Sequence, residues 1–162
     1  MPGLRISPAE ERDVPLILEF IRKLAVYEKL EHEVVTDEAT LRASLFGANP
    51  TAEVLLAYVD DQPAAFAVHF RNFSTFLGRS GIYLEDLFVE PAMRGRGIGT
   101  ALLAYLAKLA VERGCGRLNW AVLEWNENAI GFYRRLGAVL LEQWRICRLS
   151  GEALRQLAER AT

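Results

Sequence analysis

The chain of 162 residues has few of the residues that define disulfide-rich and metal-binding proteins. Its two cysteines, Cys115 and Cys147, show no C-x-x-C spacing, so we expect reduced thiols rather than a disulfide framework. Its two histidines, His32 and His69, are scattered, and no H-x-x-x-H or H-E-x-x-H spacing exists. We therefore predict no metal, and we interpret His69 in AAFAVHF as a satisfied core or sheet histidine.

Long hydrophobic runs and an excess of one charge are also lacking. The stretch TALLAYLAKLAV is interrupted by Lys108 and falls short of the ~18 residues of a membrane-spanning helix. The segment MPGLRISPAEERDVP is charged and lacks the apolar run of a signal peptide. The net charge of −2 gives no reason to expect a nucleic-acid partner. These absences predict a soluble, cytoplasmic protein with neither a membrane nor a nucleic-acid partner.

Helical and strand periodicities alternate along the chain and predict an α/β fold. The length and a hydrophobic fraction of 51% fit one domain over residues 1–162. Strands are expected at residues 4–7, 52–59, 63–70, 81–89 and 117–123, with an antiparallel hairpin around the turn DDQP. Helices are expected at residues 15–29, 36–46, 97–113, 127–136 and 150–160. Residues 138–149, AVLLEQWRICRL, are expected to form a terminal strand pair or bent ribbon.

The segment RGRGIG, residues 94–99, lies between an expected strand and an expected helix. Glycine at alternate positions lets the backbone approach an anion, and the N–H groups at a helix N-terminus attract one. Arg94 and Arg96 add positive charge. The alternative interpretation is a tight turn with two solvated arginines.

The glycine spacing decides which phosphate ligand fits. A P-loop requires G-x-x-x-x-G-K-[ST], and no lysine follows here. The dinucleotide fingerprint requires G-x-G-x-x-G on the first strand of a βαβ unit, whereas this G-x-G-x-G lies late in the chain after strands that look antiparallel. Both of these functions are therefore disfavoured.

The loop does match R-x-x-G-x-G, the pyrophosphate loop of the GCN5-related N-acetyltransferases, and two further segments agree. YLEDLFVEPAMRGRGIG resembles that family's central strand and loop, and VLEWNENAIGFYRRLGA resembles its next strand and helix. LAVYEKLEHEV and YLED look like the diamine branch, which acts on spermidine, spermine or thialysine. The resemblance implies a mixed, largely antiparallel twisted sheet that is splayed between two strands and flanked by helices on both faces. It also implies a cytoplasmic homodimer that uses acetyl-CoA as co-substrate.

The same resemblance implies where acetyl-CoA binds. Pantetheine would pair with backbone groups of the central strand and pyrophosphate with the loop amides, while the asparagine before the later helix contacts the carrier and also caps that helix. The residues assigned to the carrier are Leu87, Phe88, Val89, Arg94, Gly95, Arg96, Gly97, Ile98, Gly99, Thr100, Asn126, Glu127, Asn128 and Ala129.

Acetyl transfer to an amine requires a base for the ammonium and an acid for the departing thiolate. Glu85 interrupts the apolar run GIYLEDLFV, where desolvation would raise its pKa, and strand alternation would turn Asp86 to the opposite face. In the resembled branch this glutamate acts on the amine, and we assign Glu85 as the base that takes the ammonium proton through a water molecule. Tyr133 matches the family's acid. The alternative interpretation of Glu85 is a carboxylate within a buried hydrogen-bond network, and that of Tyr133 is an aromatic residue of the core.

The acceptor side follows from the charge of a diamine, which calls for carboxylates and aromatic faces. YEKLEHE, residues 27–33, supplies both, although a solvated charge cluster at a helix end is the alternative interpretation. FSTFLGRSG departs from the branch, which usually has a tryptophan there and one residue fewer. The residues assigned to the substrate are Tyr27, Glu28, Glu85, Asn119, Trp120, Ala121 and Glu142.

Two function classes follow. The first is an acetyl-CoA-dependent N-acetyltransferase that acts on a primary amine of a small polycationic or lysine-like molecule, with a protein or another amine as a further acceptor class. The second is a non-catalytic acyl-CoA-binding sensor. Glu85 and Tyr133 favour the enzyme, because binding alone requires neither.

Overall fold

A computed structural model describes residues 2–161, which form two compact units that meet between Ala121 and Val122. The first unit contains the strands β1 (Leu4–Pro8), β2 (Glu53–Val59), β3 (Gln62–Ser74), β4 (Arg79–Val89) and β5 (Leu118–Trp120). Its helices are α1 (Val14–Glu28), α2 (Glu38–Phe46) and α3 (Ile98–Glu112). The second unit contains α4 (Glu127–Arg135) and α5 (Gly151–Ala158).

The five strands form one sheet in the order β1-β2-β3-β4-β5. The first four strands pair antiparallel, and β4 pairs parallel with β5. The hairpin between β2 and β3 turns at Asp60 and Asp61, both with positive φ, as its tight turn requires. The expected mixed, largely antiparallel sheet is therefore confirmed.

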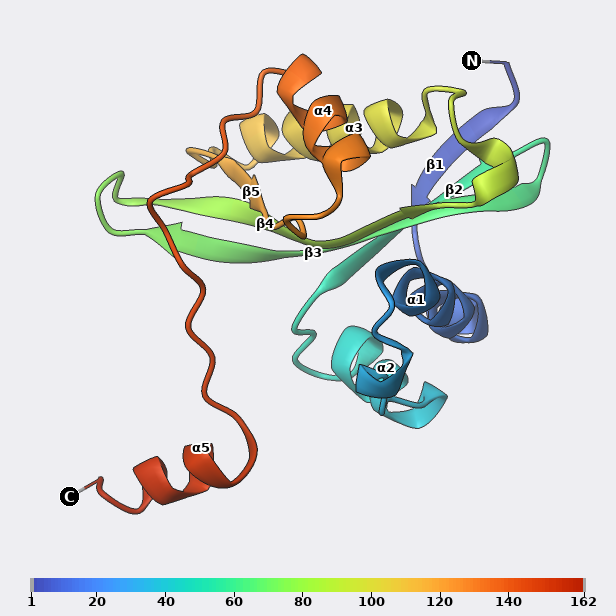
Figure 1. Ribbon diagram of the computed structural model, residues 1–162. Helices are drawn as coiled ribbons and strands as arrows, with labels where there is room; N and C mark the ends of the chain where they lie inside the picture. The colour runs from blue at the N-terminus through green and yellow to red at the C-terminus, as the bar shows by residue number, and fades with distance from the viewer. Residues whose placement is uncertain (1, 162) are drawn as a thin grey trace. The chain divides into compact units, whose positions relative to one another are not determined.

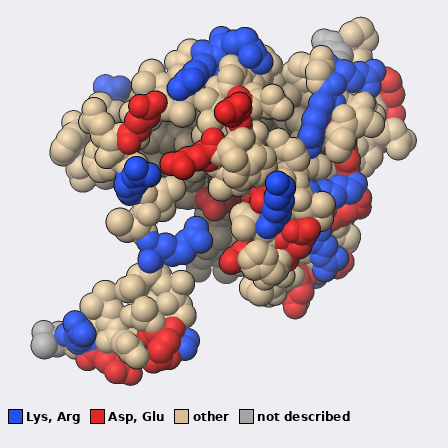
Figure 2. Space-filling model, in the orientation of Figure 1, with Lys and Arg blue, Asp and Glu red and all other residues tan. Residues whose placement is uncertain are grey.

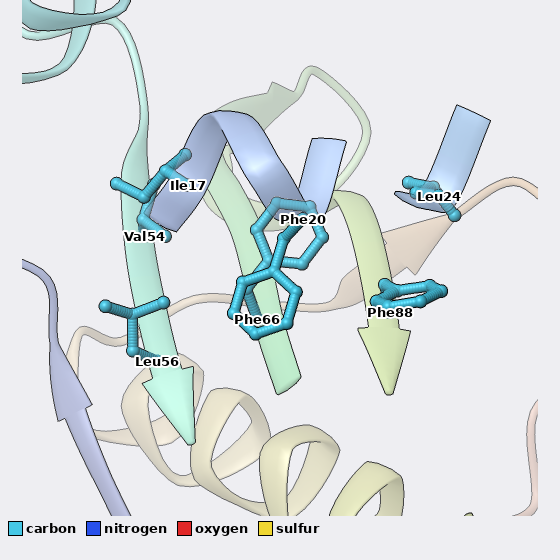
Figure 3. Packing of buried hydrophobic residues seen from close by; sticks show 7 residues of the cluster. All are labelled: Ile17, Phe20, Leu24, Val54, Leu56, Phe66 and Phe88. Carbon is cyan, nitrogen blue, oxygen red and sulfur yellow. The ribbon is translucent and has the colours of Figure 1, made fainter. Parts of the chain in front are cut away.

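Helices cover both faces of this sheet, with α1 and α2 on one face and α3 on the other (Figure 1). Phe20 of α1 stacks on Phe66 of β3 with ring centroids 5.3 Å apart (Figure 3). Phe88 of β4 also lies against the Phe20 ring. The other buried members of this cluster are Ile17, Leu24, Val54 and Leu56. On the opposite face α3 buries Ile98, Leu102, Leu103, Leu106 and Ala110.

Capping residues mark the helix boundaries. The Asp37 side chain accepts a hydrogen bond of 2.8 Å from Thr40 N–H and begins α2, which ends at Gly47. Gly114, after α3, and Gly137, after α4, both have positive φ.

The strand β4 contains a bulge that the sequence did not predict. Val68 lies opposite Asp86 and His69 lies opposite Leu84, so Glu85 is the extra residue. Asp86 lines a pocket against α1, while His69, one residue after Val68, belongs to the other face. The regular alternation of side chains between the two faces is therefore interrupted at Glu85. The argument that alternation places Glu85 and Asp86 on opposite faces does not hold at this bulge.

The expected ribbon over residues 138–149 is wrong, because these residues have no strand structure. A strand is stable only when another strand satisfies its backbone groups, and the second unit contains no strand among the described residues. Val139, Leu141, Trp144 and Ile146 are exposed along this segment.

His69 is buried at 2% exposure, but its Nδ1 makes no hydrogen bond within the described residues, so the expectation of a satisfied histidine is wrong. Its nearest carboxylate oxygen, Glu53 Oε2, lies 3.7 Å away and is held at 2.6 Å by Arg113. Burial lowers the pKa of His69. Burial therefore favours the neutral imidazole at this position in the core.

Acidic and basic side chains are interspersed on the face drawn in Figure 2, in keeping with the small net charge. Among residues 2–161, none of the helices is long and apolar enough to cross a bilayer. Within the same range, His, Cys, Asp and Glu do not form a group of three that could hold a metal ion.

Candidate active site

The end of β4 has an open edge. β5 pairs only with Ile82, Tyr83 and Leu84, while β4 continues to Val89. Residues 85–89 of β4 therefore lie beyond β5, with residues 86–89 paired to β3 on one side and no described strand on the other; we call this stretch the open edge. It is the splay between two strands that the resemblance implied.

The hydrogen-bond pattern indicates which backbone groups the open edge presents. Glu90 N–H donates to Ala64 O at 2.8 Å, so the backbone groups of Glu90 point to β3. Because this direction repeats every second residue, the backbone groups of Phe88 also point to β3. Leu87 and Val89 direct theirs away from β3. A chain of amides such as pantetheine would meet these two residues, with Phe88 supporting them from the core.

The glycine loop follows the open edge and begins α3. Gly95 and Gly97 have φ of +74° and +82°, a conformation that other residues rarely adopt. A Cβ built on either glycine would meet nothing within 4 Å, so the space above the loop is open. The first helical bond joins Ala101 N–H to Gly97 O at 2.9 Å. The N–H groups of the preceding residues of α3, Ile98, Gly99 and Thr100, are consequently available to an anion.

The two loop arginines differ in their contacts. Arg94 Nε donates to Val89 O at 3.0 Å, and the guanidinium lies 4.7 Å from the Tyr27 ring centroid and 5.5 Å from that of Phe88. Arg96 contacts Met93 Sδ at 3.1 Å. Both side chains are exposed, but Arg94 is not merely solvated, because its guanidinium lies against the Tyr27 ring and joins the loop to α1.

The two adjacent acids of β4 have different environments. Glu85 is exposed on the bulge, so the expected desolvation of this residue is wrong. Asp86 is half-buried, and burial, followed by repulsion from Glu85 and Glu28, raises its pKa to about 6. The carboxyl pKa that burial raises in this strand is that of Asp86.

A pocket of ≈ 290 Å³ lies where Asp86 faces the end of α1. Three carboxylates, Glu28, Glu33 and Asp86, are among its lining residues, and burial raises the pKa of Glu28. We call it the carboxylate pocket. The remaining lining residues are Ile21, Leu24, Ala25, Leu30, Val34, Val35 and Thr36. Negative groups in an otherwise aliphatic pocket suit an alkyl chain that carries an ammonium.

The other expected substrate residues of the first unit lie at its edges. Tyr27, next to Glu28 at the end of α1, has its ring beneath Arg94. Asn119 and Trp120 are half-buried on β5, opposite Tyr83 and Leu84 of β4, and Ala121 follows the strand. The β3–β4 hairpin carries Phe76, which is fully exposed.

The second unit contains the remaining expected residues. Asn126 caps α4 by accepting from Ala129 N–H at 3.3 Å, so its predicted capping role is confirmed. Glu127, Asn128 and Ala129 form the first turn of α4. Tyr133 is half-buried on α4, with its ring centroid 5.3 Å from that of Phe132. Glu142 is exposed and lies 3.9 Å from Arg134.

The sequence pattern missed Asp86 and the aliphatic lining of the carboxylate pocket. Two adjacent acids in an apolar strand indicate that one of them is buried, but alternation cannot show which one when a bulge lies between them. Leu30, Val34 and Val35 belong to a segment after α1 whose apolar residues have no regular period, so periodicity gave no signal.

The five-stranded mixed sheet with helices on both faces is the fold of the acetyltransferase class. A sequence model of the acetyltransferase (GNAT) family matches residues 19–138, and the chain belongs to this family. It is an N-acetyltransferase. Members of the family use acetyl-CoA as co-substrate.

Curated relatives match the chain over nearly its whole length. Thialysine N-epsilon-acetyltransferase of Mus musculus is 40% identical over 99% of this chain and 100% of its own. L-ornithine N5-acetyltransferase of Arabidopsis thaliana is 32% identical over 94% of this chain and 87% of its own. A spermidine/spermine N(1)-acetyltransferase-like protein of Homo sapiens is 32% identical over 98% of this chain and 24% of its own.

Solved structures support the fold. An integron cassette protein from the mobile metagenome of V. cholerae has a TM-score of 0.81 at 27% identity, over 98% of this chain and 99% of its own. An aminoglycoside acetyltransferase from an uncultured soil metagenomic sample, in complex with sisomicin, has a TM-score of 0.78 at 18% identity, over 93% and 97%. The second likeness concerns the fold alone.

Proposed function

We propose that this N-acetyltransferase transfers the acetyl group of acetyl-CoA to a primary amine of a small diamine, polyamine or lysine-like molecule. The observation that carries the proposal is the carboxylate pocket beside the open edge, with Glu28 and Asp86 among aliphatic side chains. Thialysine, ornithine and spermidine are flexible, mostly aliphatic chains with a terminal primary amine and at least one further amino group. Their names in three relatives support the same substrate class.

In this proposal the first unit binds both substrates. Leu87 and Val89 pair with the pantetheine amides, Phe88 supports them, and the loop from Arg94 to Thr100 holds the pyrophosphate through its N–H groups. The carboxylate pocket holds an ammonium of the acceptor that does not react. Tyr27 and, at the β5 side, Asn119, Trp120 and Ala121 complete the acceptor site.

The chemistry requires that the reacting ammonium lose a proton before its nitrogen attacks the thioester carbon. We assign this step to Glu85, whose exposed carboxylate on the bulge can take the proton through water. The new C–N bond forms, the C–S bond breaks, and the Tyr133 hydroxyl gives its proton to the CoA sulfur. The second proton of the attacking nitrogen leaves as the amide forms and, through water, restores the Tyr133 hydroxyl, so that one proton is released overall at Glu85. Asn126, Glu127, Asn128 and Ala129 contribute carrier contacts, and Glu142 contributes an acceptor contact.

The acceptor class is tested by following thiol release from acetyl-CoA with thialysine, ornithine, spermidine and butylamine. Butylamine is the matched control, because it has an alkyl chain and a reacting amine but no second cation. We expect the first three to be preferred, and Glu28→Gln to raise their KM on the order of tenfold while that of butylamine changes little. Equal kcat/KM for spermidine and butylamine in the wild type would contradict the pocket assignment. Turnover of none of these amines would contradict the substrate class.

The homodimer and the cytoplasmic location implied by the resemblance stay predictions. Large apolar side chains are exposed along the second unit, among them Val139, Trp144 and Leu154, and exposed apolar patches often mark protein interfaces. Light scattering of the purified chain measures the mass directly, and we expect twice that of one chain.

A further inference from the structure

Arg94 connects three parts of the first unit that carry different functions. It begins the glycine loop, its Nε donates to Val89 O at the open edge, and its guanidinium stacks on Tyr27 at the end of α1. A planar guanidinium can stack on a ring with its face while its N–H groups bind acceptors at its edge. Arg94 can therefore contact a phosphate without leaving Tyr27.

No carboxylate lies within ion-pair distance of Arg94 among residues 2–161. Within the described residues its positive charge faces the rings of Tyr27 and Phe88 and the Val89 carbonyl. A bound anion on the glycine loop would meet this charge directly and would restrict the side chain further.

Tyr27 precedes Glu28, the α1 residue that contributes a carboxylate to the pocket. The helix ends there, and Lys29 takes the left-handed conformation with φ of +61°. Two backbone bonds close the helix end: Lys29 N–H donates to Val26 O at 3.2 Å, and Leu30 N–H donates to Ala25 O at 2.8 Å. Because Tyr27 and Glu28 belong to this closed last turn, a side-chain contact that fixes Tyr27 also influences where Glu28 lies.

One helical turn earlier, Lys23 binds Glu90, directly after β4. Lys23 and Tyr27 therefore form two successive contacts from the same side of α1 to residues 88–94. Only the contact of Tyr27 reaches the glycine loop, at Arg94, which makes Lys23 a matched control for Tyr27.

We propose that Arg94 is a positioning residue that links the two substrates: by stacking on Tyr27 while its loop holds the carrier, it fixes Glu28 in the carboxylate pocket, so that CoA and amine bind with positive cooperativity. This linkage rests on the proposed function, which supplies the two ligands. Linkage is reciprocal, so CoA raises the affinity for the amine by the same factor.

The test is calorimetric titration of CoA, which carries no acetyl group to transfer, with and without saturating thialysine. We expect thialysine to tighten CoA binding by about fivefold in the wild type. Tyr27 also belongs to the proposed acceptor site, so thialysine is raised until it saturates the Tyr27→Leu variant. The ring is absent there, so the two CoA affinities become equal, while the affinity for CoA alone stays within about twofold. Tyr27→Phe keeps the ring and retains the linkage. Lys23→Met removes the contact with Glu90 and also retains the linkage.

A wild type that turns over thialysine but binds CoA equally well with and without it overturns the linkage and leaves the proposed function intact. Retention of the linkage in Tyr27→Leu, or its loss in Tyr27→Phe, likewise overturns the role of the Arg94–Tyr27 stack. A wild type that binds CoA but shows neither binding nor turnover of thialysine, ornithine and spermidine overturns the proposed function together with the linkage.

Discussion

Val68 of β3 lies opposite Asp86 of β4, whereas His69 lies opposite Leu84, and this one-residue shift determines the environments of the two β4 acids. Glu85 is exposed on the bulge, and Asp86 reaches the carboxylate pocket beside Glu28. The bulge thereby separates Glu85, whose carboxylate contacts water, from Asp86, whose pKa is raised to about 6.

The first prediction concerns the charge on Asp86. Its folded pKa of about 6 exceeds the ordinary 3.8, so the ionised form destabilises the fold, fully above pH 6 and progressively less as the pH falls to 4. Asp86→Asn removes this cost and should stabilise the protein at pH 7.5 by ~1–3 kcal/mol. Urea denaturation at pH 7.5, 5 and 4 measures the advantage, which should shrink steadily. A stabilisation that does not vary with pH would show that the carboxylate is not the cause.

The second prediction concerns Gly97 in the carrier loop. Gly97→Ala forces a side chain into a φ of +82° and into the open space where the phosphates approach, so affinity for acetyl-CoA should fall on the order of tenfold. Gly114→Ala is the matched control, because Gly114 has φ of +67° and similarly open surroundings after the other end of α3. Calorimetry should show a loss for the first variant only. Equal affinities in two folded variants would remove the loop from the carrier site.

The third prediction concerns Gly81, where β4 meets β5. A Cβ there would lie 2.5 Å from Asn72 Oδ1 and 3.1 Å from Arg117 O, so Gly81→Ala should destabilise the protein by about 1–3 kcal/mol. Gly131→Ala in α4 has its nearest such neighbour at 3.5 Å and should be neutral or stabilising by about 0.5–1 kcal/mol. Thermal unfolding distinguishes the two. A wild-type Tm for Gly81→Ala would mean that β4 and β5 can separate further at no cost.

The fourth prediction concerns Tyr133. Tyr133→Phe keeps the ring beside Phe132 and removes only the hydroxyl, so kcat should fall by about 10²-fold with little change in the affinity for acetyl-CoA. Steady-state kinetics together with calorimetry separate the two effects. Wild-type kcat in this variant would show that the tyrosine serves packing alone.

Local signals predicted most of the first unit. Asp37, Gly47 and Gly114 mark helix ends through their own hydrogen bonds or φ angles, and the hairpin at Asp60 depends on four adjacent residues. The glycine loop was recognisable because its backbone conformation requires glycine. Features of this kind are determined within a few residues of the chain.

The errors concern features that depend on distant partners. The bulge at Glu85 is a matter of register between β3 and β4, and no residue within β4 specifies it. Residues 138–149 have the composition of a strand, but a strand also needs a neighbour, which local sequence does not reveal. The unsatisfied Nδ1 of His69 likewise depends on how Arg113 holds Glu53.

The central claim is that this chain catalyses acetyl transfer with Glu85 as the base for the amine. A primary ammonium has a pKa of about 10, so at neutral pH only a small fraction of the acceptor can attack unaided. The decisive measurement is the pH dependence of kcat/KM for thialysine in the wild type, Glu85→Gln and Asp86→Asn, with CoA affinity measured alongside.

We predict that Glu85→Gln lowers the rate by about 10²-fold at pH 7.5, recovers part of it by pH 9.5, and leaves CoA affinity unchanged. Asp86→Asn should raise KM without that recovery, since its carboxylate holds the acceptor rather than the proton. An equal loss at every pH in Glu85→Gln would mean that the carboxylate acts by electrostatic positioning. A Glu85→Gln profile identical to that of the wild type would contradict the account.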